Sequence, residues 1–209
     1  MKKLRLNVSS FSVEKSHVMS LLLFSSLLAF GQEKGSLSID WGSWRTKYLY
    51  PVTNIRYDSP YFLKNVQIQT RLRSYGTLFF ASKDGYDFSP IATYRFHKKE
   101  SKFSFHVGLG TDLRIRLVND SRAHVSSSAE PLLYADIQYD FGKWQVKLPV
   151  WNRYYANGIG FSILPEIAVN AGKKLSIFSR FEANYMAVYN YDHAFSADVF
   201  IGLKWKFLE

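Results

Sequence analysis

Residues 195–207 read FSADVFIGLKWKF, and in this stretch apolar side chains alternate with mostly polar ones. Phe195, Ala197, Val199, Ile201, Leu203, Trp205 and Phe207 share one face of an extended strand, and Ser196, Asp198, Phe200, Gly202, Lys204 and Lys206 share the other. Successive side chains of a β-strand point to opposite faces, so the stretch predicts a strand with one oily and one largely polar side. An aromatic residue, Phe207, closes it near the end of the chain.

The same alternation recurs along most of the chain. It is strongest in residues 103–117, 133–141 and 144–150, and it is also present in 159–171, 175–188, 89–96, 66–73, 52–57 and 37–41. The first of these segments exceeds the roughly 9–11 residues that cross a bilayer as a tilted strand. No segment after residue 31 has the 18 consecutive apolar residues that predict a membrane-spanning helix. The sequence therefore predicts an all-β fold.

One predicted hairpin joins residues 133–141 to 144–150. Gly142-Lys143 lies between them, and glycine at the first position is typical of a two-residue type II′ turn. Pairing Phe141 with Trp144 keeps the apolar residues of both strands on one face, as a correct register requires. The turn and the alternation therefore predict the same register.

A second predicted hairpin joins residues 159–171 to 175–188. A two-residue loop would set oily residues opposite polar ones, whereas a three-residue loop at 172–174 restores the parity. That register places Glu166 directly across from Arg180 on the polar face. We expect an ion pair between them, because cross-strand pairs of opposite charge stabilise a sheet.

The first 31 residues differ in character from the rest. Lys2, Lys3, Arg5 and Lys15 precede an apolar run of thirteen residues, 18–30, and Ala29-Phe30-Gly31 has the small-x-small pattern of a cleavage site. The run is shorter than the roughly 20 residues of a membrane-spanning helix. Residues 1–31 are therefore predicted to be a secretory signal peptide, and residues 32–207 the mature domain.

A chain-terminal amphipathic strand that ends in an aromatic residue resembles the last strand of bacterial outer-membrane β-barrels. The whole pattern resembles the small, eight- to ten-stranded members of this class in Gram-negative bacteria, with a signal peptide in the style of the Bacteroidetes. The resemblance implies a closed antiparallel transmembrane β-barrel in the outer membrane. It also implies that Trp205 and Phe207 belong to the assembly signal. Ten strands are predicted, with eight as the alternative, and even totals are the rule for such barrels.

The polar faces of the strands would all point into one lumen if the sheet closes. They carry Arg71, Arg73, Asp112, Arg114, Arg116, Asp136, Asp140, Lys147, Glu166, Arg180, Glu182, Asp198 and Lys204. A secreted β-sandwich or a lipocalin-like cup also alternates, but its dry core could not hold so many charges. A small membrane barrel filled by ion pairs and water can, so a lumen charge network is predicted.

Loop lengths predict the orientation of the barrel. The turns after Phe96, Phe141 and Ala171 are short, and the connections 76–88, 119–131, 152–158 and 189–194 are longer. Outer-membrane barrels keep short turns in the periplasm, so the last strand is predicted to end there. Aromatic girdles are expected at both rims: Tyr154, Tyr155, Tyr189 and Tyr191 outside, and Phe96, Phe103, Phe141, Trp144, Trp205 and Phe207 at the periplasmic side.

The composition limits the partners and the chemistry. The chain has 27 Lys and Arg against 17 Asp and Glu, a formal net charge of +10, and no cysteine. Nucleic acid is not expected as a partner, because the basic residues are spread over alternating strands of a secreted chain. The expected partners are outer-membrane lipids including lipopolysaccharide, the barrel-assembly machinery and other outer-membrane proteins. No metal or cofactor motif is present, and the glycines of Gly108-x-Gly110 are expected to relieve crowding in a narrow lumen.

Few residues could support catalysis. His106 is expected to face the lumen away from other charges, as a network member rather than a catalyst. His124 with Ser126, Ser127 and Ser128 lies in the longest predicted outer loop, where a Ser-His pair could form. Ser-rich polar loops are usually only solvated, so no catalytic residue is assigned.

Two enzyme families have partly similar segments. Tyr154-Tyr155-Ala156-Asn157-Gly158 with Glu166 is distantly similar to the His-x-Ser-Asn segment and downstream Glu of outer-membrane lipid A deacylases, but Tyr154 and Ala156 occupy the His and Ser positions. Asp192-His193 is similar to the Asp and His of the ten-stranded omptin proteases, with a different spacing. Neither similarity supplies a complete catalytic set.

Three functions follow from the predicted barrel. The leading one is a non-enzymatic barrel with a narrow, charge-filled lumen, acting as a structural, adhesive or accessory component through its outer loops or lipid-facing wall, because eight to ten strands leave little room for a channel. The alternative is an anion-preferring pore or transporter, favoured if Arg71, Arg73, Arg114 and Arg116 are not neutralised. The third is a lipid-modifying or proteolytic enzyme.

Overall fold

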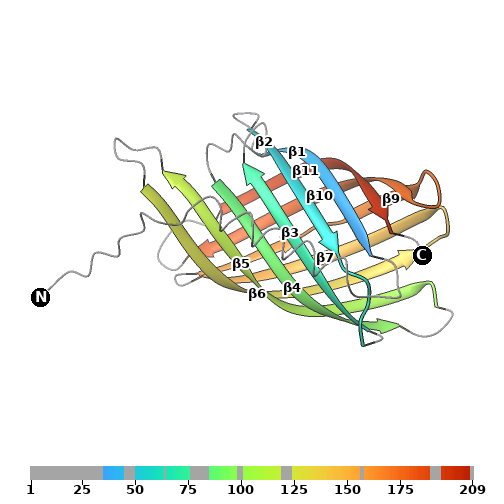
Figure 1. Ribbon diagram of the computed structural model, residues 1–209. Helices are drawn as coiled ribbons and strands as arrows, with labels where there is room; N and C mark the ends of the chain where they lie inside the picture. Colours follow the sequence, from blue (N-terminus) through green and yellow to red (C-terminus); the bar gives the residue numbers. More distant parts are fainter. Residues whose placement is uncertain are drawn as a thin grey trace, which may run out of the picture. The chain divides into compact units, whose positions relative to one another are not determined.

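The computed structural model describes residues 35–44, 50–63, 65–75, 85–97, 101–118, 124–155, 158–188 and 194–207. The chain divides into two units, Met1–Gly31 and Gln32–Glu209, and the predicted signal peptide in the first lies outside the described residues. The second unit contains β1 Ser36–Trp44, β2 Tyr50–Asp58, β3 Val66–Tyr75, β4 Gly85–His97, β5 Phe103–Val118, β6 His124–Asp140, β7 Trp144–Tyr155, β8 Gly158–Ile163, β9 Glu166–Asn170, β10 Leu175–Val188 and β11 Ala194–Lys206 (Figure 1).

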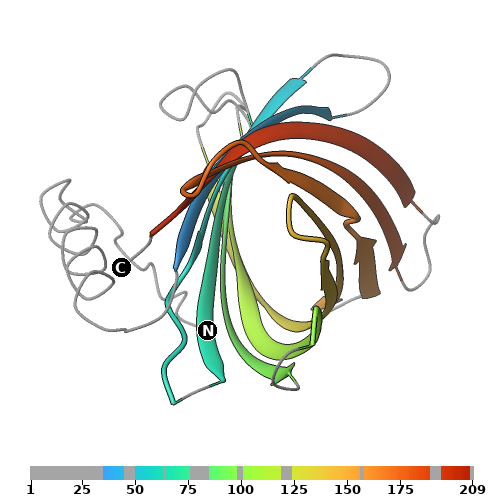
Figure 2. The same cartoon turned by 90° about the vertical axis from the view of Figure 1, so that its right-hand side faces the viewer.

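These strands form one antiparallel sheet that closes on itself. Strands pair in chain order except that β8 and β9 each pair with β7 and β10 instead of with each other, and β1 pairs with both β2 and β11. The pairing of the first strand with the last leaves no open edge. Figure 2 shows the strands curving around a common axis. The predicted closed antiparallel β-barrel is confirmed.

β8 and β9 are the two halves of one barrel strand. Both pair with β7 on one side and with β10 on the other, in an unchanged register. The interruption falls at Leu164 and Pro165, because proline has no N–H to give to the ladder. Leu164 N still donates to Pro149 O at 2.8 Å, and Phe181 N donates to Pro165 O at 3.0 Å. The eleven strands of the described residues therefore make a ten-stranded barrel, and the alternative of eight is wrong.

Both predicted hairpins have the predicted register. Phe141 N donates to Trp144 O at 2.8 Å across the β6–β7 turn, where Gly142 has a φ of 82°. A positive φ costs glycine little, which explains glycine at the first turn position. Ala171 N donates to Leu175 O at 2.9 Å across the β9–β10 turn, and Arg180 lies opposite Glu166.

Several strands extend further toward the long-connection end than the alternation predicts, and β4, β6 and β7 extend furthest. β4 begins at Gly85, β6 begins at His124, and β7 continues to Tyr155. The predicted outer loops 119–131 and 152–158 are therefore wrong in extent, and the predicted loop 76–88 ends earlier. Ladder pairing with the neighbouring strand continues after the apolar alternation ends, as in the pairing of Thr111 with Pro131. Apolar side chains alternate only over the part of a strand whose outward face lies in apolar surroundings.

Large apolar side chains on the outward face are exposed around the barrel. They come from β1 and from every strand from β3 to β11, with Leu37, Ile68, Phe96, Leu109, Ile137, Leu148, Phe161, Ile167, Ile177 and Ile201 as examples. Soluble monomers rarely expose contiguous apolar patches above a few hundred Å². In the part of the chain that is described, no helix is long and apolar enough to cross a membrane.

Candidate functional site: the lumen and its outer mouth

Charged side chains fill the lumen. Among the described residues, those buried there are the seven cationic residues Arg56, Arg71, Arg73, Lys147, Arg153, Arg180 and Lys204, and the eight carboxylate residues Asp40, Asp58, Asp87, Asp112, Asp136, Glu166, Glu182 and Asp198. A chain with a net charge of +10 thus has a nearly neutral lumen. Buried charges need partners, because an unpaired ion in a low-dielectric interior costs several kcal/mol.

Ion pairs in the middle of the lumen cross from one wall to another. Glu182 on β10 accepts from Arg71 Nη2 at 2.9 Å and from Arg73 Nη2 at 2.5 Å, both on β3. Arg56 Nη2 on β2 donates to Glu166 on β9 at 2.8 Å. β2, β1 and β11 separate β3 from β10 around the ring, so these pairs span the lumen rather than follow its wall.

Glu166 and Arg180 lie opposite each other in register, as predicted, yet each ion pair goes elsewhere. Glu166 pairs with Arg56, and Arg180 Nη2 donates to Asp40 Oδ1 on β1 at 3.0 Å. A closed barrel brings several walls within reach of one long guanidinium, so strand register alone does not select its partner. Asp40 Oδ1 also accepts from Asn54 at 2.5 Å, which joins β2 to the same network.

Apolar side chains share the lumen with these charges. Ile91, Leu132, Tyr134, Trp151 and Leu164 form one buried cluster, and Val52, Tyr75 and Phe200 form another. The guanidiniums of Arg71 and Arg153 lie 4.8 and 5.0 Å from the Trp151 ring centroid, a cation–π arrangement. The lumen is therefore packed like a protein core.

Inward-facing glycines make room for this packing. A Cβ on Gly202 would lie 2.6 Å from Phe178 Cζ and 2.5 Å from Ile39 O on β1. A Cβ on Gly108 would lie 2.7 Å from Ala92 O and 3.0 Å from Ile91 Cγ2. This agrees with the expectation that Gly108 and Gly110 relieve crowding.

At the short-turn end, the connection between β2 and β3 places Tyr61 under the lumen. Tyr61 Oη lies 2.9 Å from His106 Nε2, and His106 Nδ1 lies 2.7 Å from Asp136 Oδ1. Lys147 Nζ lies 3.3 Å from Asp136 Oδ2. Burial raises the pKa of the Tyr61 hydroxyl, so this group stays protonated and can donate to the imidazole. The expectation that His106 lies away from other charges is wrong, because Asp136 is its register partner on β6.

Ion pairs at the outer mouth follow the wall instead of crossing it. Asp112 on β5 accepts from Arg153 Nε on β7 at 2.9 Å and from Arg114 Nη2 at 3.2 Å. Arg114 Nε also lies 3.2 Å from Glu130 on β6, and Arg114 Nη2 donates to Tyr155 Oη at 2.9 Å. All of these residues belong to the adjacent strands β5, β6 and β7.

A cavity of about 240 Å³ remains at this mouth. Its lining includes Arg73, Arg114, Arg153, Tyr155 and Asn184. On its inner side the packing is tight, with no space for a water molecule among these described side chains: Arg71, Arg73, Asp87, Ser89, Asp112 and Arg153. These six side chains therefore close the inner side of the cavity to water where they pack together.

The predicted network residues point inward wherever their side chains are described. Asp198 is buried opposite Glu182 of the neighbouring strand, and Lys204 is buried on the lumen side of β11. The side chain of Arg116 lies outside the described part. Asp40, Arg56, Asp58, Asp87 and Arg153 also belong to the buried lumen charges but were not predicted, although each lies on the inward face of its strand. Arg153 fell in a predicted loop, and Asp40 and Arg56 lie in the two weakest alternating segments.

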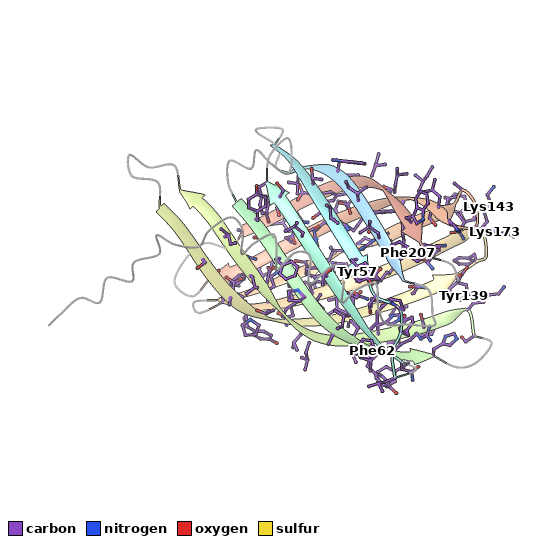
Figure 3. The ribbon with its side chains drawn as sticks, in the orientation of Figure 1. Tyr57, Phe62, Tyr139, Lys143, Lys173 and Phe207 are labelled. Atoms are coloured by element: carbon purple, nitrogen blue, oxygen red, sulfur yellow. The ribbon has the colours of Figure 1, made fainter. Side chains whose placement is uncertain are left out.

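Aromatic side chains mark the short-turn rim (Figure 3). Phe96, Phe103, Phe141, Trp144, Trp205 and Phe207 are all exposed there, as the predicted girdle requires. The rings of Tyr139 and Phe141 lie 4.4 Å apart, and those of Tyr57 and Phe207 lie 6.5 Å apart. Lys143 and Lys173 lie beyond this band at the tips of the turns.

The long-connection rim agrees less well with the prediction. Tyr154 is exposed on the outward face, but Tyr155 faces the lumen, because it is the next residue in the strand. Its hydroxyl accepts the hydrogen bond from Arg114, so its place in the predicted outer girdle is wrong. Tyr189 and Tyr191 lie outside the described residues.

No catalytic constellation is seen in the described part of the chain. The side chains of His124 and Ser126 and the residues Asp192 and His193 lie outside it, and Ser128 Oγ donates to Glu130 at 3.2 Å. Glu166, the match to the deacylase Glu, is buried in the mid-lumen ion pair with Arg56. The described residues contain no group of three His, Cys, Asp or Glu that could hold a metal ion.

The chain is similar in fold to small outer-membrane β-barrels of known structure. The N-terminal β-barrel domain of Pseudomonas aeruginosa OprF is 12% identical, with a TM-score of 0.42 over 85% of this chain and 100% of that one. The KdgM porin, solved with disordered oligogalacturonate, is 11% identical, with a TM-score of 0.46 over 83% of this chain and 99% of that one. Neisserial surface protein A is 13% identical, with a TM-score of 0.37 over 83% and 96%.

These similarities concern the arrangement of strands only. No protein-family model matches the sequence. No curated protein matches it either.

Proposed function

We propose that the protein is a non-enzymatic β-barrel of the bacterial outer membrane whose lumen is closed. Its outward face is apolar around the ring and its inward face is charged, which is the reverse of a soluble barrel. Most of its strands have at least the roughly 9–11 residues that a tilted transmembrane strand needs. A closed sheet also satisfies the backbone groups that lipid could not hydrogen-bond.

The orientation follows from the turns and the rim. The longest connection, residues 76–84, lies at one end of the barrel, although the β7–β8 connection there is only residues 156–157; the short β6–β7 and β9–β10 turns and the exposed aromatic residues lie at the other end. Short turns belong in the periplasm, so β11 would end there with Trp205 and Phe207 at the inner interface. These two side chains are 53% and 43% exposed on the outward face, where the assembly machinery could contact them.

The observation that supports a closed lumen is the set of cross-wall ion pairs below an outer cavity whose inner side is tightly packed. Arg71 and Arg73 share the carboxylate of Glu182 from β10, and Arg114 pairs with Asp112 and Glu130. These ion pairs weigh against an anion-preferring pore, which would need arginines without carboxylate partners along the lumen. A pore would also need water where Arg73, Asp87 and Asp112 are tightly packed.

A barrel of this kind acts through its surfaces. Its long connections face outward in the proposed orientation, and its wall faces lipid, including lipopolysaccharide in the outer leaflet. We infer a structural, adhesive or accessory role through these two surfaces, with lipids and other outer-membrane proteins as partners.

Two measurements on the full-length protein test this proposal. On a gel of isolated outer membranes the unheated protein should migrate differently from the boiled protein, because a folded barrel resists SDS. In planar bilayers the same protein should give no steady current. A heat-insensitive product would contradict the membrane barrel, and a steady anion-selective current would contradict the closed lumen.

A further inference from the structure

The blind cavity at the outer mouth is lined by an unusual set of side chains for a lumen that is elsewhere neutral. Among the described residues, its lining includes the arginines Arg73, Arg114 and Arg153 and one carboxylate, Asp87. The carboxylates that pair with these arginines, Glu182, Asp112 and Glu130, are not part of this lining. The arginine of each ion pair therefore faces the cavity, and its carboxylate partner does not.

These guanidiniums are held in place before any ligand arrives. Arg153 donates from Nε to Asp112 at 2.9 Å and from Nη1 to Ser162 at 2.8 Å. Arg114 is held by Asp112 and lies 5.0 Å from the Tyr155 ring centroid. An arginine has five N–H donors in a rigid fork, so one that is fixed by a carboxylate keeps donors for an anion. Preorganised donors bind with little further loss of side-chain entropy.

The remaining lining suits hydroxyl groups and a ring. Tyr155, Ser162, Asn184 and Ser196 contribute hydroxyl and amide groups, and Met186 and Phe195 contribute apolar surface. Ser162 Oγ donates to Asn184 Oδ1 at 2.6 Å, which leaves the Tyr155 hydroxyl proton and an Asn184 N–H as donors for a ligand. The Tyr155 ring is fitted against Gly160, where a Cβ would lie 2.7 Å from Tyr155 Cε2. Glycine at this position therefore lets the tyrosine lie against the wall beside the arginines.

We propose that this cavity binds a small hydroxylated organic anion, of the size and chemistry of a single sugar acid. The anionic group would lie on Arg114 and Arg153, and the hydroxyl groups on Tyr155 and Asn184. The volume of about 240 Å³ is below the roughly 300–1,000 Å³ of drug-sized sites, so the ligand is one ring rather than a chain. Binding does not require passage, because the floor of the cavity is closed.

Calorimetric titration of the detergent-purified, full-length barrel with D-glucuronate, D-glucose and inorganic phosphate tests this proposal. Glucuronate should bind in a saturable manner, and glucose about tenfold or more weakly, since it lacks the charge that the arginines pair with. Phosphate should also bind more weakly, because it lacks the hydroxylated ring. Glucose binding as tightly as glucuronate would overturn the role of the arginines, and phosphate binding as tightly would overturn the role of the hydroxyl groups.

Two variants locate the site. Arg114→Gln, at a partly exposed side chain, should weaken glucuronate binding about tenfold. Lys102→Gln removes the same charge at the opposite end of the barrel, where Lys102 is exposed, and should leave binding unchanged. Equal effects of the two changes, or no saturable glucuronate binding by the unmodified protein, would overturn the proposal.

The heat-dependent gel shift separates this outcome from a failure of the barrel itself. If Arg114→Gln abolishes the gel shift, the Tyr155→Phe variant takes its place in the binding measurement. This variant keeps the ring and loses only the hydroxyl. A barrel that shifts on heating but binds no glucuronate leaves the proposed function standing and removes this inference. A protein that shows no shift at all contradicts the proposed function first.

Discussion

The middle of the lumen and its outer mouth contain the same kinds of side chain, yet Arg71, Asp87 and Asp112 pack tightly on the inner side and a cavity of about 240 Å³ lies at the mouth. In the middle, Arg71 and Arg73 on β3 reach Glu182 on β10, so each ion pair crosses the lumen. At the mouth, Arg114 and Arg153 pair with Asp112 on their own side of the ring. The two regions therefore differ in the direction of their ion pairs rather than in the kind of charge they contain.

The largest expected effect comes from Glu182→Ala in the middle. The change leaves Arg71 and Arg73 buried without their shared carboxylate, which should lower the free energy of unfolding by about 3–5 kcal/mol. This loss is measured by denaturant titration of the barrel in vesicles, with tryptophan fluorescence as the readout. Planar-bilayer recording on the same sample should show current where the unmodified protein shows none.

Glu130→Ala is the matched control at the mouth. Its carboxylate pairs with Arg114 in a partly exposed position, so the expected loss is about 0–1 kcal/mol without any current. Similar unfolding midpoints for the two variants would show that the cross-wall pairs do not hold the middle of the barrel together.

A smaller effect is expected from Gly202→Ala, which tests packing in the middle without changing charge. The added methyl group would clash with Ile39 O across the β1–β11 seam and with Phe178. We expect a loss of about 1–3 kcal/mol, as for other overpacked cores. Gly172→Ala, in a turn with no atom within 4 Å of the added carbon, should change stability by about 0.5 kcal/mol or less in the same titration.

Tyr61→Phe extends the comparison to the short-turn end. The variant keeps the ring under Arg95, which lies 3.8 Å from the ring centroid, and removes the hydroxyl that contacts His106. The expected loss is about 1 kcal/mol, the usual net value of one hydrogen bond. If the denaturation midpoint does not move, Tyr61 fills space at this end without holding His106.

The smallest effect on stability is expected from Arg114→Ala at the mouth. Arg114 is partly exposed and its partner Asp112 keeps Arg153, so the loss should be about 1 kcal/mol or less. Bilayer recordings should stay silent, because the floor of the cavity lies below this residue. Steady current from this variant would place the seal at the mouth instead of the middle.

Much of the fold followed from local features of the sequence. The alternation around residues 103–117 and 195–207 predicts strands and the side of each residue, and the turns at Gly142 and Gly172 predict register. Strand ends such as those of β6 and β7 were missed, because backbone pairing continues where side chains no longer alternate. Phe200 was a signal available in advance, since it interrupts the polar face of the last strand and packs in the lumen.

The sequence by itself determined which residues face the lumen, because side-chain direction in a strand has a period of two and needs no knowledge of distant residues. It did not determine which charges meet. Glu166 was expected to pair with Arg180 and instead pairs with Arg56, while Arg180 pairs with Asp40. Only closure of the sheet decides this, because it brings strands that are distant around the ring within the reach of one side chain. The cross-wall ion pairs in the middle of the lumen are therefore a product of the tertiary structure.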